Sequence, residues 1–378
     1  MNKVIAIVIL VSLFLNVSCQ KNNSKKIRTV QAIDTYIEEQ INIHEIPGLA
    51  LGVVKNGNLI YEGYFGKADI ENNIPVNEHT LFPLYSITKV VVSTAIFQLI
   101  EQGKLSLDDT IGNYLPKLPN SWKKVQIAHL LSHSSGLPDF SFTDRKLSNT
   151  ALQKRLFKQN TSFEKGNQYE YNQTNFWILA QIIQKITGQT LESFILKNQF
   201  QNNLNNTFFS SNFGDSIAHR ANRYYYVKPL KKYRKVTPNF QKRSHAANGL
   251  NTTLKSFISW NKKLDNNTLL KKETKLNMWQ PFNYTNKTAT FLHGWKMYRS
   301  NNNAVSYGFT GGLQTGYRKF VAHHLTIVLL TNGSKYHPVH NSIIEEVAGI
   351  VNDVLLDKAH EQSRKNKQFE NTTTHALK

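Results

Sequence analysis

Strand-like runs lie near both ends of this 378-residue chain, while the residues between them have mainly helical patterns. Residues 48–66 hold two such runs joined by Asn56-Gly57, which is a strong signal for a β-hairpin turn. Residues 304–320 and 325–333 are again rich in aromatic and β-branched side chains. Since both ends supply strands, we predict an α+β fold. One antiparallel sheet is built from both chain ends and flanked by helices, with a mainly helical subdomain inserted between them.

Three segments are expected to be helices that flank this sheet. Residues 28–45 are amphipathic and end before an Ile-Pro-Gly sequence, and residues 341–356 form a similar last helix. Residues 86–103, "SITKVVVSTAIFQLIEQG", are apolar nearly all round, which predicts a helix buried on most sides. We therefore place the folded domain at residues 28–357, with the helical insert at about 104–260.

Both ends of the chain are predicted to lie outside this domain. Residues 1–19 are typical of a signal peptide, because a lysine precedes an apolar run that is too short to cross a bilayer comfortably. The only cysteine, Cys19, resembles the lipid-accepting cysteine of a bacterial lipoprotein, although Asn16 stands where such signals usually carry leucine. Plain secretion is the alternative. We expect a polar tether at 20–27, a polar tail at 358–378, and export to the periplasm or cell envelope, where a lipid on Cys19 would anchor the protein to the membrane.

The net charge of +21 is the most unusual bulk property of the chain. Basic proteins commonly bind nucleic acid, anionic membranes or acidic polymers. Here the lysines are scattered among asparagines, without a phosphate-binding loop, zinc knuckle or RNA-binding aromatic signature. We interpret the charge as a solvated surface and expect no nucleic-acid partner, and we keep adhesion to anionic envelope polymers as an alternative. The 13 histidines show no metal-ligand spacing, so no metal or other cofactor is predicted.

A serine three residues before a lysine, Ser86 and Lys89, begins the apolar segment. Residues three apart share a helix face, so Lys89 would lie beside Ser86. A serine hydroxyl needs a nearby base to become nucleophilic, and a lysine desolvated in an apolar helix has a lowered pKa. Free backbone N–H groups at a helix start can also stabilise an oxyanion. The spacing alone also fits a capping serine with an exposed lysine. The same spacing begins at four other serines, Ser18, Ser121, Ser162 and Ser259.

Further blocks along the chain distinguish these interpretations. "LYSITK" is followed by "LIEQGKLSLDDTIGNYLPKLP", by "HLLSHSSGLPDF" at 129–140 and by "YEYNQTNFWILAQIIQKITG" at 169–188. Two later blocks are "AANGLNTTLKSFISW" at 246–260 and "YGFTGGLQTGYR" at 307–318. In this order they resemble the serine β-lactamase-like family, which includes penicillin-binding proteins, D-aminopeptidases and esterases related to class C β-lactamases. The resemblance spans roughly residues 30–355.

The resemblance implies a role for each matching residue. Ser86 matches the serine that becomes acylated, Lys89 matches its partner, and Tyr171 matches the tyrosine that relays a proton to the leaving group. Tyr169 is the rival for this position, but the Gln-Thr-Asn that follows fits better when Tyr171 leads. Either Lys89 or Tyr171 could act as the base. The oxyanion would be held by the backbone N–H groups of Ser86 and Gly312.

Two departures from the family pattern concern substrate binding. Gln173 replaces the asparagine that usually stands two residues after the tyrosine, and its longer amide could still contact the lysine or a substrate. Phe309, with Thr310 and Gly311, occupies the place of Lys-Thr-Gly or His-x-Gly, so a polar group that helps to bind a substrate carboxylate is missing. Arg318 is a source of charge that the sequence cannot place.

Two other polar residues in the matching blocks are assigned to packing beneath the site. They are His133 and Asp139, both in "HLLSHSSGLPDF".

Together these features predict a serine hydrolase that works through an acyl-enzyme without a cofactor. The expected substrates are amides or esters: D-amino-acid peptides of the cell wall, small esters and, less readily because of Phe309, β-lactams. The alternative is a protein of the same fold that binds wall fragments, or is acylated slowly without useful turnover, because its third motif is degenerate.

Overall fold

The computed structural model describes residues 26–140, 144, 146–201, 205–286, 289–300, 303–312, 314–336 and 340–355. The predicted signal peptide with Cys19, most of the predicted tether and the predicted polar tail lie outside these residues. Within the described ranges, no helix has both the length and the apolar character needed to cross a membrane.

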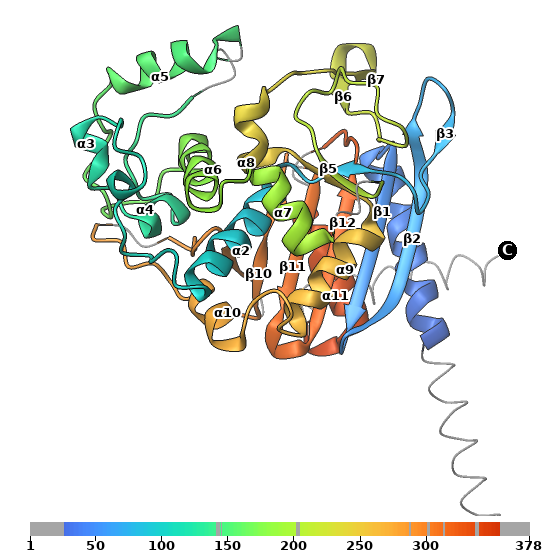
Figure 1. Cartoon of the computed structure of the whole chain (residues 1–378). Helices are drawn as coiled ribbons and strands as arrows, with labels where there is room; N and C mark the ends of the chain where they lie inside the picture. The colour runs from blue at the N-terminus through green and yellow to red at the C-terminus, as the bar shows by residue number, and fades with distance from the viewer. Residues whose placement is uncertain are drawn as a thin grey trace, which may run out of the picture.

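Seven antiparallel strands form the central sheet, in the order β3-β2-β1-β12-β11-β10-β9. The N-terminal part of the chain supplies β1 (Gly48–Lys55), β2 (Asn58–Asp69) and β3 (Ile74–Pro75). The C-terminal part supplies β9 (Lys296–Arg299), β10 (Val305–Gly311), β11 (Thr315–Phe320) and β12 (Leu325–Thr331). The two groups meet where β1 pairs with β12, which Figure 1 shows as blue strands beside orange ones. The prediction of an α+β fold with one sheet built from both chain ends is confirmed.

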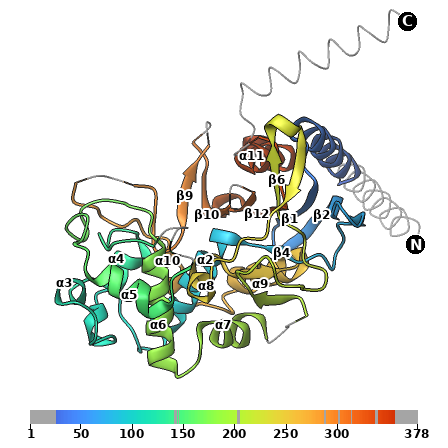
Figure 2. The same cartoon turned by 90° about the horizontal axis from the view of Figure 1, so that it is seen from above.

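Helices cover both faces of this sheet. One face packs against the helix formed by residues 26–44 and against α11 (His340–Val351). The opposite face packs against α2 (Thr88–Glu101) and α9 (Leu254–Asp265), as the view from above in Figure 2 shows. The sheet is therefore the middle layer of three.

The alternation of side chains along β1 explains the two cores. Leu49, Leu51 and Val53 are buried with the first helix and α11, whereas Ala50 and Val54 are buried with α2 and α9. Successive side chains of a strand point to opposite faces, so a strand buried on both sides needs apolar residues at every position.

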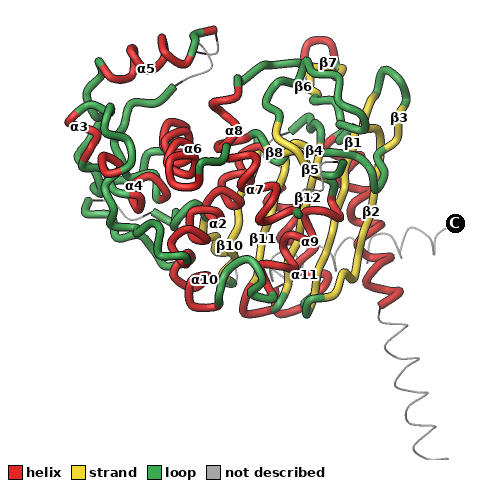
Figure 3. Tube along the Cα trace, in the orientation of Figure 1, coloured by secondary structure: helices red, strands yellow, loops and turns green. Residues whose placement is uncertain are grey.

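Between β3 and β9 the chain is mainly helical, and Figure 3 shows most of this helical mass to one side of the sheet. Besides α2 and α9, the helices of this stretch are α3 (Asn120–Lys123), α4 (Ile127–Leu131), α5 (Asn149–Phe157), α6 (Gln173–Thr187), α7 (Leu191–Phe200), α8 (His245–Asn248) and α10 (Lys272–Met278). The stretch also contains short strands that the sequence did not predict. They form two small sheets, one of β4 (Phe82–Pro83), β8 (Leu250–Thr252) and β5 (Thr207–Phe209), the other of β6 (Tyr224–Val227) and β7 (Lys232–Lys235).

Local signals explain several element boundaries. Asn56 and Gly57 have φ angles of +50° and +76°, as the predicted tight hairpin between β1 and β2 requires. The helix predicted from Ser86 begins as a 3₁₀ turn, η1 (Tyr85–Ile87), and continues as α2, which is buried on most sides as predicted. The last helix is shorter than predicted, because α11 gives way to a 3₁₀ turn, η7 (Asp353–Leu355).

Candidate active site

Ser86 lies in η1, between β4 and α2, and is partly exposed. The residue before it, Tyr85, has φ +47°, a left-handed conformation that is costly for a residue other than glycine. Tyr85 is nevertheless buried, and the neighbouring Leu84 N–H donates to the Leu250 carbonyl at 2.8 Å. Packing on both sides of the turn therefore holds Ser86 at the start of α2.

Tyr171 contacts Ser86 directly. Its Oη donates to Ser86 Oγ at 2.8 Å from the loop that precedes α6. The other tyrosine considered, Tyr169, instead packs its ring against His133 and Phe291. Of the two tyrosines, the structure brings Tyr171 to the serine.

Lys89 lies one turn further along α2 and is completely buried. Its Nζ donates to Gln173 Oε1 at 3.0 Å and to the Ala247 carbonyl at 2.9 Å, and it lies 4.8 Å from the centroid of the Tyr171 ring. Burial lowers the pKa of Lys89 to about 7, and the opposing pull of the Asp139 carboxylate is the smaller effect. An appreciable fraction of this lysine is therefore an uncharged amine near neutral pH.

The pKa of Tyr171 moves in the opposite direction. Burial raises it to about 12, although the hydrogen bonds with Ser86 and Gln173 work against that shift. Near neutral pH the phenol therefore keeps its proton. Of the two candidate bases, Lys89 is the one able to accept a proton in this range.

The block "HLLSHSSGLPDF" lies beneath Tyr171. His133 is fully buried, with its ring centroid 4.6 Å from that of Tyr171, and its Nδ1 accepts the Asn172 N–H at 3.1 Å. Burial, and to a lesser degree the charge of Lys89, holds the pKa of His133 well below its usual value. His133 thus sits as a neutral ring under the tyrosine loop, in the supporting position expected for it.

Asp139 holds the start of α6. Its Oδ1 accepts the backbone N–H groups of Gln173 and Thr174, each at 2.9 Å, and the Thr174 hydroxyl at 3.1 Å. A carboxylate at a helix N-terminus satisfies otherwise unpaired N–H groups and interacts favourably with the helix dipole. Asp139 therefore fixes the position of Gln173, which in turn accepts from Lys89.

Gly311 and Gly312 pass close to η1. A Cβ atom on Gly311 would stand 2.2 Å from the Leu84 carbonyl oxygen, and one on Gly312 would stand 3.0 Å from the ring of Tyr85. Gly312 also has φ +57°. Glycine is required here because the end of β10 approaches the turn that carries Ser86.

Phe309 and Arg318 lie on opposite faces of the sheet. Phe309 is buried beside Tyr171, with ring centroids 6.2 Å apart and the planes 20° from parallel. Arg318 is buried on the α11 side, where it donates to Asn341 and lies over the ring of Tyr298. Arg318 therefore does not supply the positive or polar group that is missing because Phe309 occupies the place of the family's lysine or histidine. Thr310 lies between Phe309 and Gly311 on β10 and is partly exposed.

A cation that no sequence pattern indicated, Arg223, packs against Tyr85, the residue before Ser86. The Arg223 guanidinium lies 5.4 Å from the centroid of the Tyr85 ring and 5.6 Å from that of Phe213, and these two rings stack on each other. Tyr85 is far from Phe213 and Arg223 in the sequence, so no local pattern could have revealed the cluster.

Across the described ranges, no group of three or more His, Cys, Asp or Glu side chains is arranged to hold a metal ion.

Comparison with known proteins identifies the family to which this fold and site belong. The family model described as Beta-lactamase matches residues 33–351, so the chain belongs to the beta-lactamase family. Members of this family are generally serine hydrolases.

Among curated proteins, PbpX of Bacillus subtilis (strain 168) is 31% identical over 184 residues, which are 48% of this chain and 45% of PbpX. The chain spans less than half the length of the curated relatives it matches.

The solved structures that share the fold include a penicillin-binding protein homologue and an amidase. The octameric penicillin-binding protein homologue from Pyrococcus abyssi has a TM-score of 0.72 at 21% identity, covering 85% of this chain and 77% of its own. The D-amino acid amidase from Ochrobactrum anthropi SV3, in complex with D-phenylalanine, has a TM-score of 0.72 at 19% identity, covering 87% and 99%.

Proposed function

We propose that the protein is a serine hydrolase that forms an acyl-enzyme on Ser86. The observation that carries this proposal is the 2.8 Å hydrogen bond from Tyr171 Oη to Ser86 Oγ, beside a buried lysine with a pKa of about 7. A serine becomes nucleophilic when a nearby group can take its proton, and this arrangement provides such a group near neutral pH.

In the first step, Lys89 acts as the base. Because Ser86 Oγ accepts a hydrogen bond from the Tyr171 hydroxyl, which keeps its proton, the proton of Ser86 itself is free to move to the uncharged amine of Lys89, one helical turn away. Ser86 Oγ then attacks the carbonyl carbon of the substrate, and the electron pair of the C=O bond moves to the carbonyl oxygen. We assign the stabilisation of this oxyanion to the backbone N–H groups of Ser86 and Gly312.

The collapse of this intermediate breaks the bond to the leaving group. The departing amine or alkoxide takes the Tyr171 proton, and the Lys89 ammonium restores it. Water then attacks the acyl-enzyme with the same groups in reversed roles, which releases a carboxylic acid and regenerates Ser86.

The aromatic wall beside Ser86 supports a substrate class. Phe309 stacks on Tyr171 and meets Phe291 edge to face, with ring centroids 5.5 Å apart. A site lined in this way favours amides or esters with an apolar or aromatic group near the scissile bond. D-amino-acid amides and peptides with such side chains are our first choice, followed by small esters. The structural neighbour that binds D-phenylalanine is consistent with this choice. We place β-lactams last, because Phe309 offers no charge to a carboxylate.

The proposal is tested by labelling with a fluorophosphonate probe, followed by measurement of the intact mass. We expect one adduct on the protein that lacks residues 1–19, and none on its Ser86→Ala variant. Ser259→Ala is the matched control, because this exposed serine begins the same Ser-x-x-Lys spacing outside the site. A folded protein without an adduct, or an adduct that persists in Ser86→Ala, would refute the proposal.

The second candidate function is binding without turnover. It is favoured by Phe309, which removes a polar group from an otherwise complete site. A stoichiometric acyl adduct that is not hydrolysed over hours, for every amide and ester tried, would support this candidate instead.

We further propose that the protein is anchored to the cell envelope through a lipid on Cys19, on the basis of residues 1–19. The protein should partition with membranes when expressed with this segment, and Cys19→Ala should release it or leave it unprocessed. An unmodified Cys19 in the mature protein would exclude the anchor.

A further inference from the structure

The β6–β7 hairpin, residues 224–235, carries a concentration of positive charge. Five of its 12 residues are lysine or arginine and none is aspartate or glutamate, whereas the whole chain has 46 lysine and arginine residues among 378. Although most lysines of the chain are scattered, those of this segment lie together on one small two-stranded sheet. Figure 1 shows this sheet at the upper edge of the molecule.

The register of the hairpin separates an inner face from an outer face. Tyr226 pairs with Tyr233 on the inner face, and the Tyr226 side chain is buried. Tyr225 pairs with Arg234, and Lys232 lies two residues before Arg234 on the same strand. Cross-strand partners share a face, and so do residues two apart, so these three side chains belong to the outer face. All three are exposed, Tyr225 to 62%.

The turn between the two strands adds two cations. Lys228 and Lys231 are both exposed there, on either side of Pro229 and Leu230. Within the ranges that the structure describes, no lysine or arginine of the hairpin forms an ion pair with a carboxylate. The outer face and the turn therefore present charge of one sign, and this charge is available to an anionic partner.

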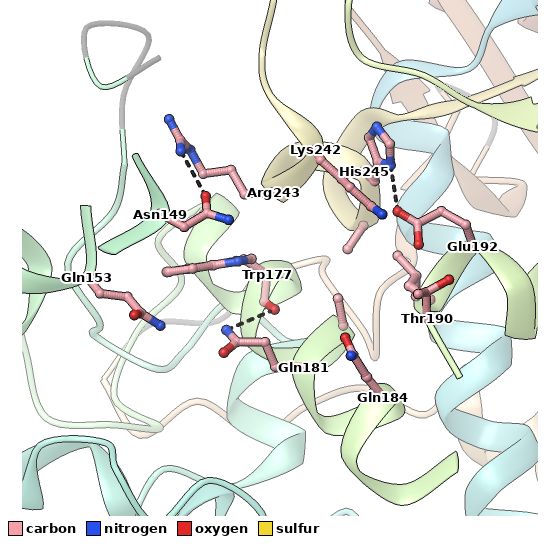
Figure 4. A pocket seen from close by; sticks show the side chains of 13 residues that line it. Asn149, Gln153, Trp177, Gln181, Gln184, Thr190, Glu192, Lys242, Arg243 and His245 are labelled. Atoms are coloured by element: carbon pink, nitrogen blue, oxygen red, sulfur yellow. Dashed lines mark hydrogen bonds and ion pairs between the residues drawn. The ribbon is translucent and has the colours of Figure 1, made fainter. Parts of the chain in front are cut away.

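The cavity shown in Figure 4 is another place where cations lie close together, and it differs from the hairpin. Lys242 and Arg243 line this cavity, but Glu192 lies in the same wall, with its Oε1 2.6 Å from His245 Nδ1. Charges of both signs in one wall do not indicate the charge of a ligand. The hairpin, by contrast, indicates an anion.

The hairpin is far from the point where the predicted tether joins the domain. Tyr233 Oη donates to the Glu45 carbonyl at 2.5 Å, so the hairpin contacts the end of the helix formed by residues 26–44. A helix of this length extends for about 28 Å, and Figure 1 shows it running down from the hairpin. A membrane that held the lipid proposed on Cys19 would face the start of this helix. The hairpin would then face away from that membrane, which favours a polymer as its partner.

We propose that the outer face of the β6–β7 hairpin binds an anionic polysaccharide, a chain of sugar rings that carry carboxylate groups. The exposed ring of Tyr225 packs against a sugar ring, while Lys232, Arg234 and the lysines of the turn contact the carboxylates. A linear polymer fits this face because the cations follow one another along a strand and its turn, about 7 Å apart for residues at alternate positions. This binding is independent of the function proposed for Ser86.

Isothermal titration with alginate oligosaccharides, which are chains of uronate rings, tests the site on the protein that lacks residues 1–19. Lys232→Gln/Arg234→Gln should weaken binding about fivefold, because each exposed ion contact contributes a few-fold in affinity. Lys154→Gln/Lys158→Gln is the matched control, since it removes the same charge from exposed positions at α5 and should weaken binding less than about twofold. Equal weakening by the two variants, or no binding of alginate to wild type, would overturn the proposal.

Tyr225→Ala separates recognition of a sugar ring from attraction by charge alone. It keeps the net charge and should weaken alginate binding about threefold, whereas Tyr225→Phe should bind like wild type. Neither change should affect the binding of linear polyphosphate, an anion without rings. Unchanged alginate binding by Tyr225→Ala would overturn the assignment to a sugar polymer.

The class of partner is tested by comparing three anions at equal concentration of charge. Alginate should bind more tightly than single-stranded DNA and more tightly than vesicles that contain anionic lipid. Tighter binding of DNA or vesicles, weakened by Lys232→Gln/Arg234→Gln, would overturn the choice of a polysaccharide. All variants should melt at the temperature of wild type, because the substituted side chains are exposed.

Discussion

Tyr171 Oη donates a 2.8 Å hydrogen bond to Ser86 Oγ, although 85 positions separate the two residues. The bond depends on a loop that His133 supports from below and that Asp139 ties to the start of α6. Neither supporting residue contacts Ser86 through a hydrogen bond that the structure describes. The tyrosine and the serine therefore form a unit whose geometry is set by residues outside it.

Removal of the Tyr171 hydroxyl tests its role as a proton relay. Tyr171→Phe keeps the ring that stacks on Phe309, so the fold should be retained. We expect kcat/KM to fall about 100- to 10,000-fold, the usual contribution of a positioned acid or base. Tyr169→Phe is the control and should stay close to wild type. Similar losses in both variants would show that the Tyr171 hydroxyl is no more important than that of Tyr169, and would contradict the relay.

The pH dependence of kcat/KM should follow Lys89. Because the uncharged amine is the active form, activity should rise with pH and level off above a midpoint near 7. The Asp139 carboxylate raises the pKa of Lys89, so Asp139→Asn should move the midpoint to lower pH. A pH–rate profile of both proteins measures this. A flat profile across neutral pH, or a shift toward higher pH, would contradict Lys89 as the base.

Lys89 should also affect how the free energy of unfolding depends on pH. Its pKa is about 7 in the folded protein and 10.5 in the unfolded chain, so between these values the unfolded chain binds one more proton. Stability should therefore rise with pH in this window. The free energy of unfolding of wild type, relative to Lys89→Met, should increase by up to about 1.4 kcal/mol per pH unit there. Denaturant unfolding at several pH values measures this difference, and a constant difference would mean that Lys89 is not desolvated.

Gly312→Ala tests the close approach of β10 to η1. The new Cβ would meet the Tyr85 ring at 3.0 Å, and φ +57° is unfavourable for alanine. If the Gly312 N–H holds the oxyanion, its displacement should lower kcat about 100- to 1,000-fold. Gly103→Ala is the matched control, because Gly103 has φ +68° and its Cβ would meet nothing within 4 Å. Equal losses in the two variants would point to general destabilisation.

Phe309→His separates the two candidate functions. If Phe309 belongs to a working site, kcat/KM for amides with aromatic side chains should fall, because the stack on Tyr171 is lost. Phe309→Leu should lose less, since it keeps an apolar surface. Steady-state kinetics on one aromatic amide and one β-lactam make the comparison. If Phe309→His instead creates strong hydrolysis where wild type has none, the natural protein is not a competent hydrolase of that substrate.

Much of the fold could be predicted because its signals are local. Asn56-Gly57 marks the hairpin, and the continuous apolar run of β1 beside it predicts a strand without reference to the rest of the chain. The small sheets could not be predicted in this way. Phe82, for example, is a strand residue because Thr252 lies opposite it, and a pairing between such distant residues has no local pattern.

The same distinction between local signals and distant contacts applies to the candidate site. Ser86, Lys89 and Tyr171 stood in motifs that could be matched, and the structure brings them together. The second acceptor of Lys89 is the backbone carbonyl of Ala247. Every residue has such a carbonyl, so the sequence does not indicate which one will accept a hydrogen bond from Lys89. The face on which Arg318 lies follows from its register opposite Gly308, which only the assembled sheet defines.

The pairing of β1 with β12 also determines when the protein can act. Leu49 lies opposite Thr331, so the sheet closes only after nearly the whole domain has been synthesised. Pairings between distant segments form slowly, because the loop between them must first be closed. During that interval the chain already contains Ser86 and Lys89, whereas Gly312 has not yet reached them. We therefore expect nascent chains to be unreactive, because the oxyanion site that we propose at Ser86 and Gly312 is completed only at the end of folding.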